Sequence, residues 1–434
     1  MGARYNERYT VDAGYGILSI FPVGRFARVE SILLIENKII DKDELKASCS
    51  YGVPDRLRPL LWRLLLEYLP TERASWTSFL AAQRETYNGL VRQLIVDVAA
   101  QSTTAGDPLS DCCSHWGGFF ADNTTLAQID KDVRRLCPEI QFFQQTTKWP
   151  HGEAVSVNLS GRVTQAELRT ENYGVDKLVG NTKKRASAEY ANAKEQGSET
   201  HWQVAERILF IYAKLNPGVK YVQGMNEVLG PIYYVLASDP DEEWAEHAEA
   251  DTFFCFQQLM SEIKDNFIKT LDDSQCGIEH SMSSFHALLS AWEPVLHAHL
   301  VGRLQIKPQF YAFRWLSLML SQEFPLPDVI GLWDALFADT KRFTLLPYVC
   351  LSMLQRVREQ LLRGDFADCL RLLQNYPETD AQILVMDAYA IREGRAVRPS
   401  TRDDDAISNG SGAKKNFAGM FTDKLRSTIN LIRK

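Results

Sequence analysis

Apolar residues recur every three or four positions along most of this chain, from about Val29 to Arg392. That spacing places apolar side chains on one face of an α-helix, so it predicts helices rather than strands. The alternation of apolar and polar residues that is typical of strands is nearly absent, and no repeat of fixed period indicates a solenoid. We therefore predict an all-α fold, with one large multi-helix domain over residues 28–393.

Breaks in this pattern set the expected helix boundaries. Gly52-Val53-Pro54 ends one helix, and Asp55 is the expected N-cap of the next, with Pro59 in its first turn. Residues 101–118 are rich in Ser, Thr, Gly and Asp, which predicts a loop. The predicted helices span 29–51, 55–69, 75–99, a stretch through Ile129 that stops at Pro138, 201–215, 221–236, 242–264, 281–300, 309–321, 327–337, 345–362, 366–373 and 380–392.

Four segments lie outside the regular helical core of this domain. Residues 1–27 form a turn-rich N-terminal extension, and residues 394–416 a charged linker. Residues 145–200 are polar and poor in large apolar side chains, which predicts a long insertion that is loosely helical around Ala186–Lys194. The last segment, 417–434, is an amphipathic and basic tail.

The tail carries apolar residues at helical spacing between basic residues. Such a segment can lie on an anionic membrane surface, and it can equally pack on its own domain. Both alternatives stay open at this stage. The basic residues are Lys414, Lys415, Lys424, Arg426, Arg433 and Lys434.

The composition is that of an ordinary globular protein, with 45% apolar and 24% charged residues among 434. A formal net charge of −7 argues against nucleic-acid binding, which requires a basic surface. No apolar run reaches the length of a membrane-spanning helix, and the N-terminus lacks the apolar core of a secretory signal. The eight cysteines are scattered without a Cys-x-x-Cys pair, so we expect free thiols and a cytoplasmic protein, with peripheral contact on endomembranes as an option.

Missing motifs exclude several classes of enzyme. The chain has no Gly-x-x-x-x-Gly-Lys-Ser/Thr loop, so it is not itself a P-loop nucleotide hydrolase. It also lacks His-Glu-x-x-His and Gly-x-Ser-x-Gly, and its eight histidines are isolated. We expect no metal site, no cofactor of its own and no chemistry on a substrate of its own.

The stretch from Ile129 to Arg135 carries a candidate chemical group. Asp132 and Arg135 lie three positions apart, so on a helix the carboxylate can brace the guanidinium. A rigid guanidinium that faces outward suits contact with phosphate oxygens. Taken alone, the same pattern also fits a surface helix with an ordinary ion pair.

Three motifs occur together in order along the chain. They are Gly52-Val53-Pro54 with Arg58-x-x-x-Trp62, then Ile129-x-x-Asp132-x-x-Arg135, then Tyr221-Val222-Gln223-Gly224-Met225-Asn226. Two later stretches, Phe313-Arg314-Trp315-Leu316 and Leu332-Trp333-Asp334-Ala335-Leu336-Phe337, extend the pattern. From about Gly52 to Ala390 the chain resembles the TBC domain, the family of GTPase-activating proteins for Rab GTPases.

The resemblance implies a two-finger mechanism that acts in trans on a GTP-bound Rab GTPase. Arg135 matches the family's arginine finger and Gln223 its glutamine finger, while the partner carries GTP and Mg²⁺. An activator of this kind regulates vesicle traffic, and we expect this one to be monomeric. The implied supporting residues are Asp132, which orients Arg135; Tyr221 and Asn226, which shape the turn at Gln223; Gly224, which lets the backbone there approach the partner closely; and Arg58 and Trp62, which support the finger helices from within.

Two other classes of protein remain as rivals. A Rab-binding adaptor without catalytic effect is open to this fold when a finger is lost, although neither finger is lost here. A purely structural helical scaffold accounts for the core but not for Arg135 and Gln223. We predict that the insertion loops out and that these two residues face one groove.

Overall fold

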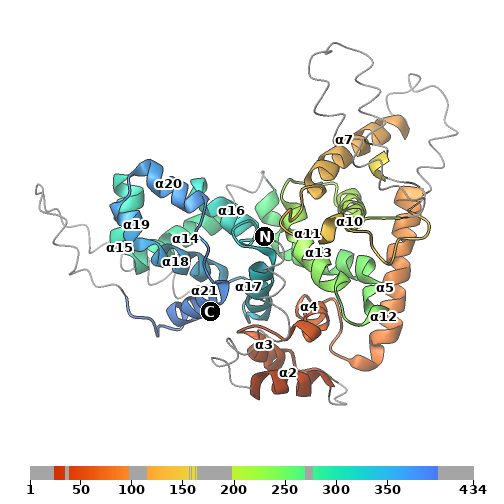
Figure 1. The fold of residues 1–434 in the computed structure, drawn as a ribbon, viewed down its shortest axis with the longest axis horizontal. Helices are drawn as coiled ribbons and strands as arrows, with labels where there is room; N and C mark the ends of the chain where they lie inside the picture. Colours follow the sequence, from red (N-terminus) through yellow and green to blue (C-terminus); the bar gives the residue numbers. More distant parts are fainter. Residues whose placement is uncertain are drawn as a thin grey trace, which may run out of the picture. The chain divides into compact units, whose positions relative to one another are not determined.

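The computed structural model describes residues 24–34, 39–96, 115–155, 157, 159–161, 163, 198–268 and 277–398. The chain divides into two compact units, one ending at Lys264 and the other beginning at Asp265. Both units are built from helices (Figure 1), and the only extended pairings among the described residues are two isolated β-bridges. The predicted all-α fold is therefore confirmed.

The first unit is organised around three central helices, α10 (His201–Leu215), α11 (Met225–Ala237) and α13 (Ala248–Ile263). In Figure 1, α7 (His115–Val133) and α5 (Trp76–Val91) lie outside them, and they pack against α10 and α13, respectively. The other helices are α2 (Gly24–Leu34), α3 (Lys42–Cys49), α4 (Arg58–Leu65) and α12 (Glu242–Ala245), and a π-helical stretch, Arg92–Val96, extends α5. Most residues of these three helices are buried, including the charged Glu206 and Arg207 of α10.

The second unit packs α18 (Leu346–Arg356) against α21 (Ala381–Arg392), and α14 (Ile278–Trp292) against α16 (Ala312–Ser317). Trp315 and Trp333 are completely buried in its core. The remaining helices are α15 (Pro294–His297), α17 (Leu326–Ala338), α19 (Arg358–Arg363) and α20 (Phe366–Gln374).

Several predicted helix starts are wrong. The sequence predicts a loop over 101–118, but α7 already begins at His115. Asp55 is not the N-cap of α4; it opens a short 3₁₀ turn, and α4 begins at Arg58 with Pro59 in its first turn, as predicted. The helix expected at 221–236 begins only at Met225, because the preceding glycine has a left-handed backbone conformation.

Other predicted helices are interrupted. The stretch 29–51 contains two helices, α2 and α3, and 345–362 is divided at Val357 into α18 and α19. The stretch 281–300 breaks at Glu293, since Pro294 has no N–H to continue the helix. Apolar periodicity survives such interruptions, which explains why the pattern alone does not reveal them.

The ends of the 145–200 insertion are joined to each other. Thr146 and Thr200 form a β-bridge, and the N–H of Thr147 donates to the carbonyl of Glu199 over 2.8 Å. Residues 164–197, including the predicted helical stretch around 186–194, lie outside the described residues, as do 1–23 and the tail at 417–434. The joined ends agree with an insertion that leaves and re-enters the fold at one place.

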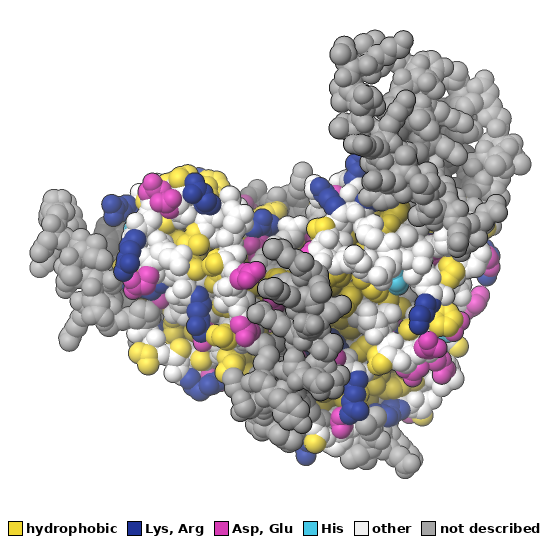
Figure 2. Space-filling view, in the orientation of Figure 1, with side chains coloured by type: hydrophobic (Ala, Val, Ile, Leu, Met, Phe, Trp, Pro, Cys, Tyr) yellow, Lys and Arg dark blue, Asp and Glu magenta, His cyan; other side chains and the backbone are white. Residues whose placement is uncertain are grey.

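The described surface carries both charges. On the face in Figure 2, lysine and arginine side chains are interspersed with acidic ones, in keeping with the modest net charge of −7. Among the described residues, no helix combines the length and apolar character needed to cross a membrane. The cysteines that the structure describes as free thiols are Cys49, Cys137, Cys255, Cys350 and Cys369.

Candidate functional site

Asp132 and Arg135 lie at the C-terminal end of α7. The helix ends at Val133 rather than continuing to Pro138 as predicted. Arg135 lies in the turn that follows, and its backbone N–H donates to the carbonyl of Asp132 over 3.3 Å. The Arg135 guanidinium pairs with the Asp132 carboxylate, as the three-residue spacing predicts. The Arg135 side chain is 60% exposed, while the Asp132 side chain is only 5% exposed. A buried carboxylate thus braces an exposed cation.

Apolar anchors hold this end of α7 in place. Leu126, Ile129, Val133 and Leu136 are all completely buried. An ideal Cβ atom on Gly230 of α11 would lie 3.0 Å from Leu136 Cδ1, so the turn that carries Arg135 packs closely on α11. The position of Arg135 is therefore fixed by neighbours on both sides.

Hydrogen bonds tie the second motif to the third. The Tyr221 hydroxyl donates to Asp132 Oδ2 over 2.8 Å, across 89 positions of sequence. Asn226 Nδ2 donates to the Asp132 carbonyl over 3.4 Å, and Asn226 Oδ1 lies 3.3 Å from the Tyr221 hydroxyl. Burial, and then the nearby Asp132 carboxylate, raise the pKa of Tyr221, so its hydroxyl stays a donor. We call Asp132, Tyr221 and Asn226 the brace.

Gln223 occupies the turn between the brace and α11. Its side chain is exposed, and the next residue, Gly224, is the N-cap of α11 with φ of +103°. A side chain at Gly224 would strain this conformation, so glycine is required for the backbone to turn here. The turn thus presents Gln223 outward while Tyr221 and Asn226, on either side of it, point inward to Asp132.

Arg58 and Trp62 lie on α4, which packs against α11. Trp62 is completely buried, and the Arg58 side chain is 16% exposed. The Arg58 guanidinium pairs with Asp55 and donates to the carbonyl of Val53 over 3.1 Å. Both residues thus lie largely buried on a helix that packs against α11.

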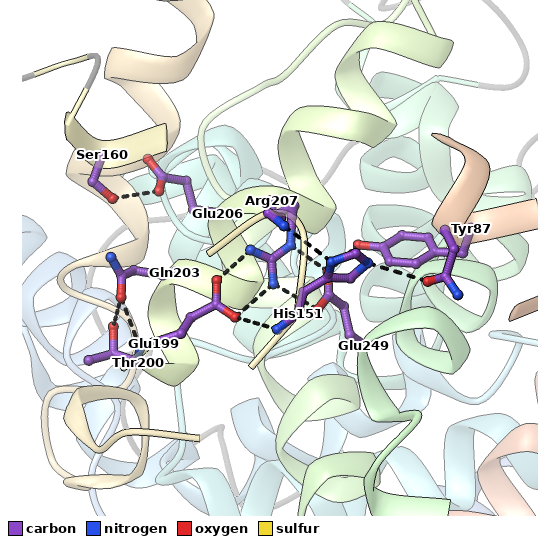
Figure 3. A network of polar contacts seen from close by, with 11 residues as sticks. Tyr87, His151, Ser160, Glu199, Thr200, Gln203, Glu206, Arg207 and Glu249 are labelled. Atoms are coloured by element: carbon purple, nitrogen blue, oxygen red, sulfur yellow. Dashed lines mark hydrogen bonds and ion pairs between the residues drawn. The ribbon is translucent and has the colours of Figure 1, made fainter. Parts of the chain in front are cut away.

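A second polar network, which the sequence does not reveal, is centred on Arg207 (Figure 3). Arg207 of α10 is 4% exposed and is clamped between Glu199 and Glu249. Its Nε donates to Glu249 Oε1 over 2.6 Å, and its Nη2 donates to Glu199 Oε2 over 2.9 Å. The Tyr87 hydroxyl also donates to Glu249, over 2.6 Å. The network links α5, α10, α13 and the returning end of the insertion.

No signal in the sequence marks these partners. Glu199 and Glu249 lie 8 and 42 positions from Arg207, so neither falls at the three- or four-residue spacing of a helical ion pair. Among the described residues, no group of three His, Cys, Asp or Glu side chains is arranged to hold a metal ion. What the geometry presents is an exposed guanidinium and an exposed amide on a buried, hydrogen-bonded base.

Comparisons with known proteins agree on one kind of domain. The profile of the family described as Rab-GTPase-TBC domain matches residues 179–362, a range that includes Gln223 but not Arg135. The chain is 46% identical to human TBC1 domain family member 13, over 83% of this chain and 96% of that protein. It is 33% identical to a TBC domain-containing protein of Schizosaccharomyces pombe, over 89% of this chain and 75% of that protein.

A solved structure shares the fold. The crystal structure of the Ypt/Rab-GAP domain of Gyp1p matches with a TM-score of 0.61, over 86% of this chain and 99% of that one. At 22% sequence identity, this likeness concerns the fold alone.

Proposed function

The chain belongs to the TBC family of Rab GTPase-activating proteins, and we propose that it accelerates GTP hydrolysis by a Rab GTPase with Arg135 and Gln223 inserted in trans. One observation carries this proposal: the brace ties both motifs to a single buried carboxylate and leaves Arg135 and Gln223 exposed. The partner in its GTP-bound form would supply GTP and Mg²⁺, so this chain needs no cofactor. By switching off a Rab, it would regulate vesicle traffic.

Arg135 would act on charge. Negative charge builds up on the transferring phosphoryl group and on the leaving oxygen during GTP hydrolysis. A planar guanidinium can donate two hydrogen bonds to these oxygens at once. Because the Asp132 brace already fixes one edge of the guanidinium, Arg135 would meet the phosphates with little loss of side-chain freedom. Such a finger is worth about 10³- to 10⁵-fold in rate, or about 4 to 7 kcal/mol of barrier.

Gln223 would act on the attacking water. Its amide oxygen can accept a hydrogen bond from the water, and its amide nitrogen can donate to a phosphate oxygen. The left-handed Gly224 lets the backbone at this point approach a partner without a Cβ in the way. In this role Gln223 would take the place of the GTPase's own glutamine.

The test is phosphate release from a panel of GTP-loaded Rab proteins. Wild type is compared with Arg135→Ala, Arg135→Lys and Gln223→Ala, and complex formation is measured separately with a GTP analogue. We expect at least one Rab to be stimulated, and each substitution to lower that stimulation by at least about 10²-fold while binding survives. Arg135→Lys should fail as well, because a point charge cannot reproduce the planar fork.

A matched control is Arg363→Ala, which removes an exposed arginine that pairs with Glu359 four residues away. Its stimulation should equal that of wild type. If Rabs bind but none is stimulated across a full panel, the non-catalytic adaptor is the correct function. If neither binding nor stimulation is found, the structural scaffold is favoured.

A further inference from the structure

Two buried carboxyl groups meet behind the site. Asp130 lies on α7, two residues before Asp132, and Glu206 lies on the facing side of α10. Asp130 is 7% exposed and Glu206 only 1% exposed. Like charges are costly to bury together, so such a pair calls for an explanation.

Each carboxyl has one oxygen with a partner and one without. Arg134 Nε donates to Asp130 Oδ2 over 2.8 Å, and the Ser160 hydroxyl donates to Glu206 Oε2 over 2.8 Å, as Figure 3 shows for Glu206. Asp130 Oδ1 and Glu206 Oε1 are buried and accept no hydrogen bond from the described residues. Because α7 packs against α10, both orphaned oxygens are buried where these two helices meet.

One proton would satisfy both orphaned oxygens. Two carboxylates can only repel, whereas a neutral carboxyl can donate to its neighbour. Burial and the negative charge of Asp130 raise the pKa of Glu206 to about 8, although the Ser160 hydrogen bond and the Arg134 charge act in the opposite direction. The groups that act on Glu206 are thus Asp130 and Arg134 from α7 and Ser160 from the insertion. Arg207, the next residue on α10, forms its ion pairs with Glu199 and Glu249 instead.

We propose that Glu206 holds a proton at neutral pH, donates it in a hydrogen bond to Asp130, and thereby acts as a positioning residue for Arg135. The hydrogen bond fastens the last turn of α7 to α10. Asp130 in turn orients Arg134, whose guanidinium lies 4.3 Å from the ring centre of Trp202 on α10. When Glu206 loses its proton, the two carboxylates repel, and the end of α7 that carries Asp132 and Arg135 moves. The effect on activity rests on the proposed function; the shared proton does not.

The first experiment follows stimulated phosphate release against pH, with the Rab's unstimulated hydrolysis subtracted at each pH. In wild type the stimulation should fall above about pH 8, by up to about tenfold per pH unit. Glu206→Gln is the matched variant, because its amide nitrogen can donate to Asp130 and its oxygen can still accept from Ser160. It has no proton to lose, so its stimulation should match wild type at pH 7 and stay level above pH 8.

Ser160→Ala provides a second variant that keeps the carboxyl pair. The Ser160 hydrogen bond favours the ionised form of Glu206, so its loss should move the fall in stimulation to higher pH. If Glu206 has only a structural role, Ser160→Ala should not change the pH at which the stimulation falls. The same fall in wild type and in Glu206→Gln would overturn the positioning role.

The second experiment needs no GTPase. The free energy of unfolding in urea is measured between pH 5 and pH 9 for wild type and Glu206→Gln. Because the pKa of Glu206 is raised in the folded chain, the folded state holds a proton that the unfolded state has lost between about pH 4.3 and pH 8. The stability of wild type relative to Glu206→Gln should therefore decrease as pH rises through this window and level off above about pH 8. If the free energies of unfolding of wild type and Glu206→Gln vary in parallel with pH, the proposal of a shared proton is wrong, whether or not any Rab is stimulated.

Discussion

Two arginines of the first unit, Arg135 and Arg207, show opposite uses of the same side chain. Arg207 is 4% exposed and lies between two carboxylates that take up its nitrogens. Arg135 is 60% exposed and pairs with one buried carboxylate, Asp132. A guanidinium that is enclosed by carboxylates holds helices together, whereas one that is braced from one side can also meet a partner's phosphate. The carboxylates of both arginines are largely buried, so the number of carboxylates and the exposure of the guanidinium separate the two settings.

Arg135→Ala should give the largest change, and that change should appear chiefly in the rate. Stimulated hydrolysis should fall by about 10³- to 10⁵-fold, equivalent to about 4 to 7 kcal/mol of barrier. Because the Arg135 side chain is mostly exposed but its partner Asp132 is buried, the free energy of unfolding should fall by about 1 to 3 kcal/mol, the cost of leaving one buried carboxylate oxygen without a partner while the Tyr221 hydrogen bond remains. Phosphate release and urea unfolding measured on one preparation test both statements. A loss of stability above about 3 kcal/mol, as expected for a buried arginine, would contradict the comparison, since it would make Arg135 a structural arginine too.

Arg207→Ala should mainly lower the free energy of unfolding rather than the rate of stimulated hydrolysis. Glu199 and Glu249 would remain buried without a counter-charge, which costs about 3 to 5 kcal/mol. Burial alone would raise the pKa of Glu249, but Arg207 holds that pKa below its usual value, so the variant should also recover stability at acid pH, where Glu249 becomes neutral. Urea unfolding at pH 5 and pH 7 checks both effects.

The control for Arg207→Ala is Arg356→Ala in the second unit, where the ion pair with Asp387 is half exposed. It should leave the unfolding midpoint nearly unchanged at both pH values. Equal losses for the two variants would show that burial does not separate them.

Tyr221→Phe should weaken the brace without touching either finger. It removes the 2.8 Å hydrogen bond to Asp132 and leaves a buried carboxylate oxygen with one partner fewer, which costs about 1 to 3 kcal/mol. Part of this cost should appear in the rate, as a decrease of about tenfold in stimulation, because Asp132 then holds Arg135 less firmly. Tyr376→Phe is the control, since it removes a 3.0 Å hydrogen bond to the carbonyl of Met353 in the second unit. That variant should lose stability but keep the pH 7 rate.

The family, the all-helical fold and the Asp132–Arg135 pair could be predicted from the sequence, because motif order, apolar periodicity and short spacing are local signals. The comparisons confirm the family, and the structure confirms the fold and the pair. The periodicity of apolar residues does not reveal that α7 begins at His115 and ends at Val133. It reports which side chains share a helix face, but not where the backbone hydrogen bonds of the helix begin and end. Nor could it find the partners of Arg207 or Glu206, which come from other segments and meet only when the helices pack.

Gly224→Ala should have the smallest effect of the four, and it tests the turn at Gln223. At φ of +103° a Cβ atom strains the backbone by about 1 to 2 kcal/mol, so stability should fall by about that amount. If the turn relaxes to relieve the strain, Gln223 leaves its position, and stimulation should fall with it. Gly89→Ala is the control, because a Cβ atom there meets no other atom within 4 Å and the residue lies inside α5. That variant should instead gain about 0.5 to 1 kcal/mol of stability and keep its rate. An unchanged rate in Gly224→Ala, with the expected loss of stability, would mean that the turn tolerates strain without moving Gln223, and the amide would then owe its position to the brace rather than to the glycine.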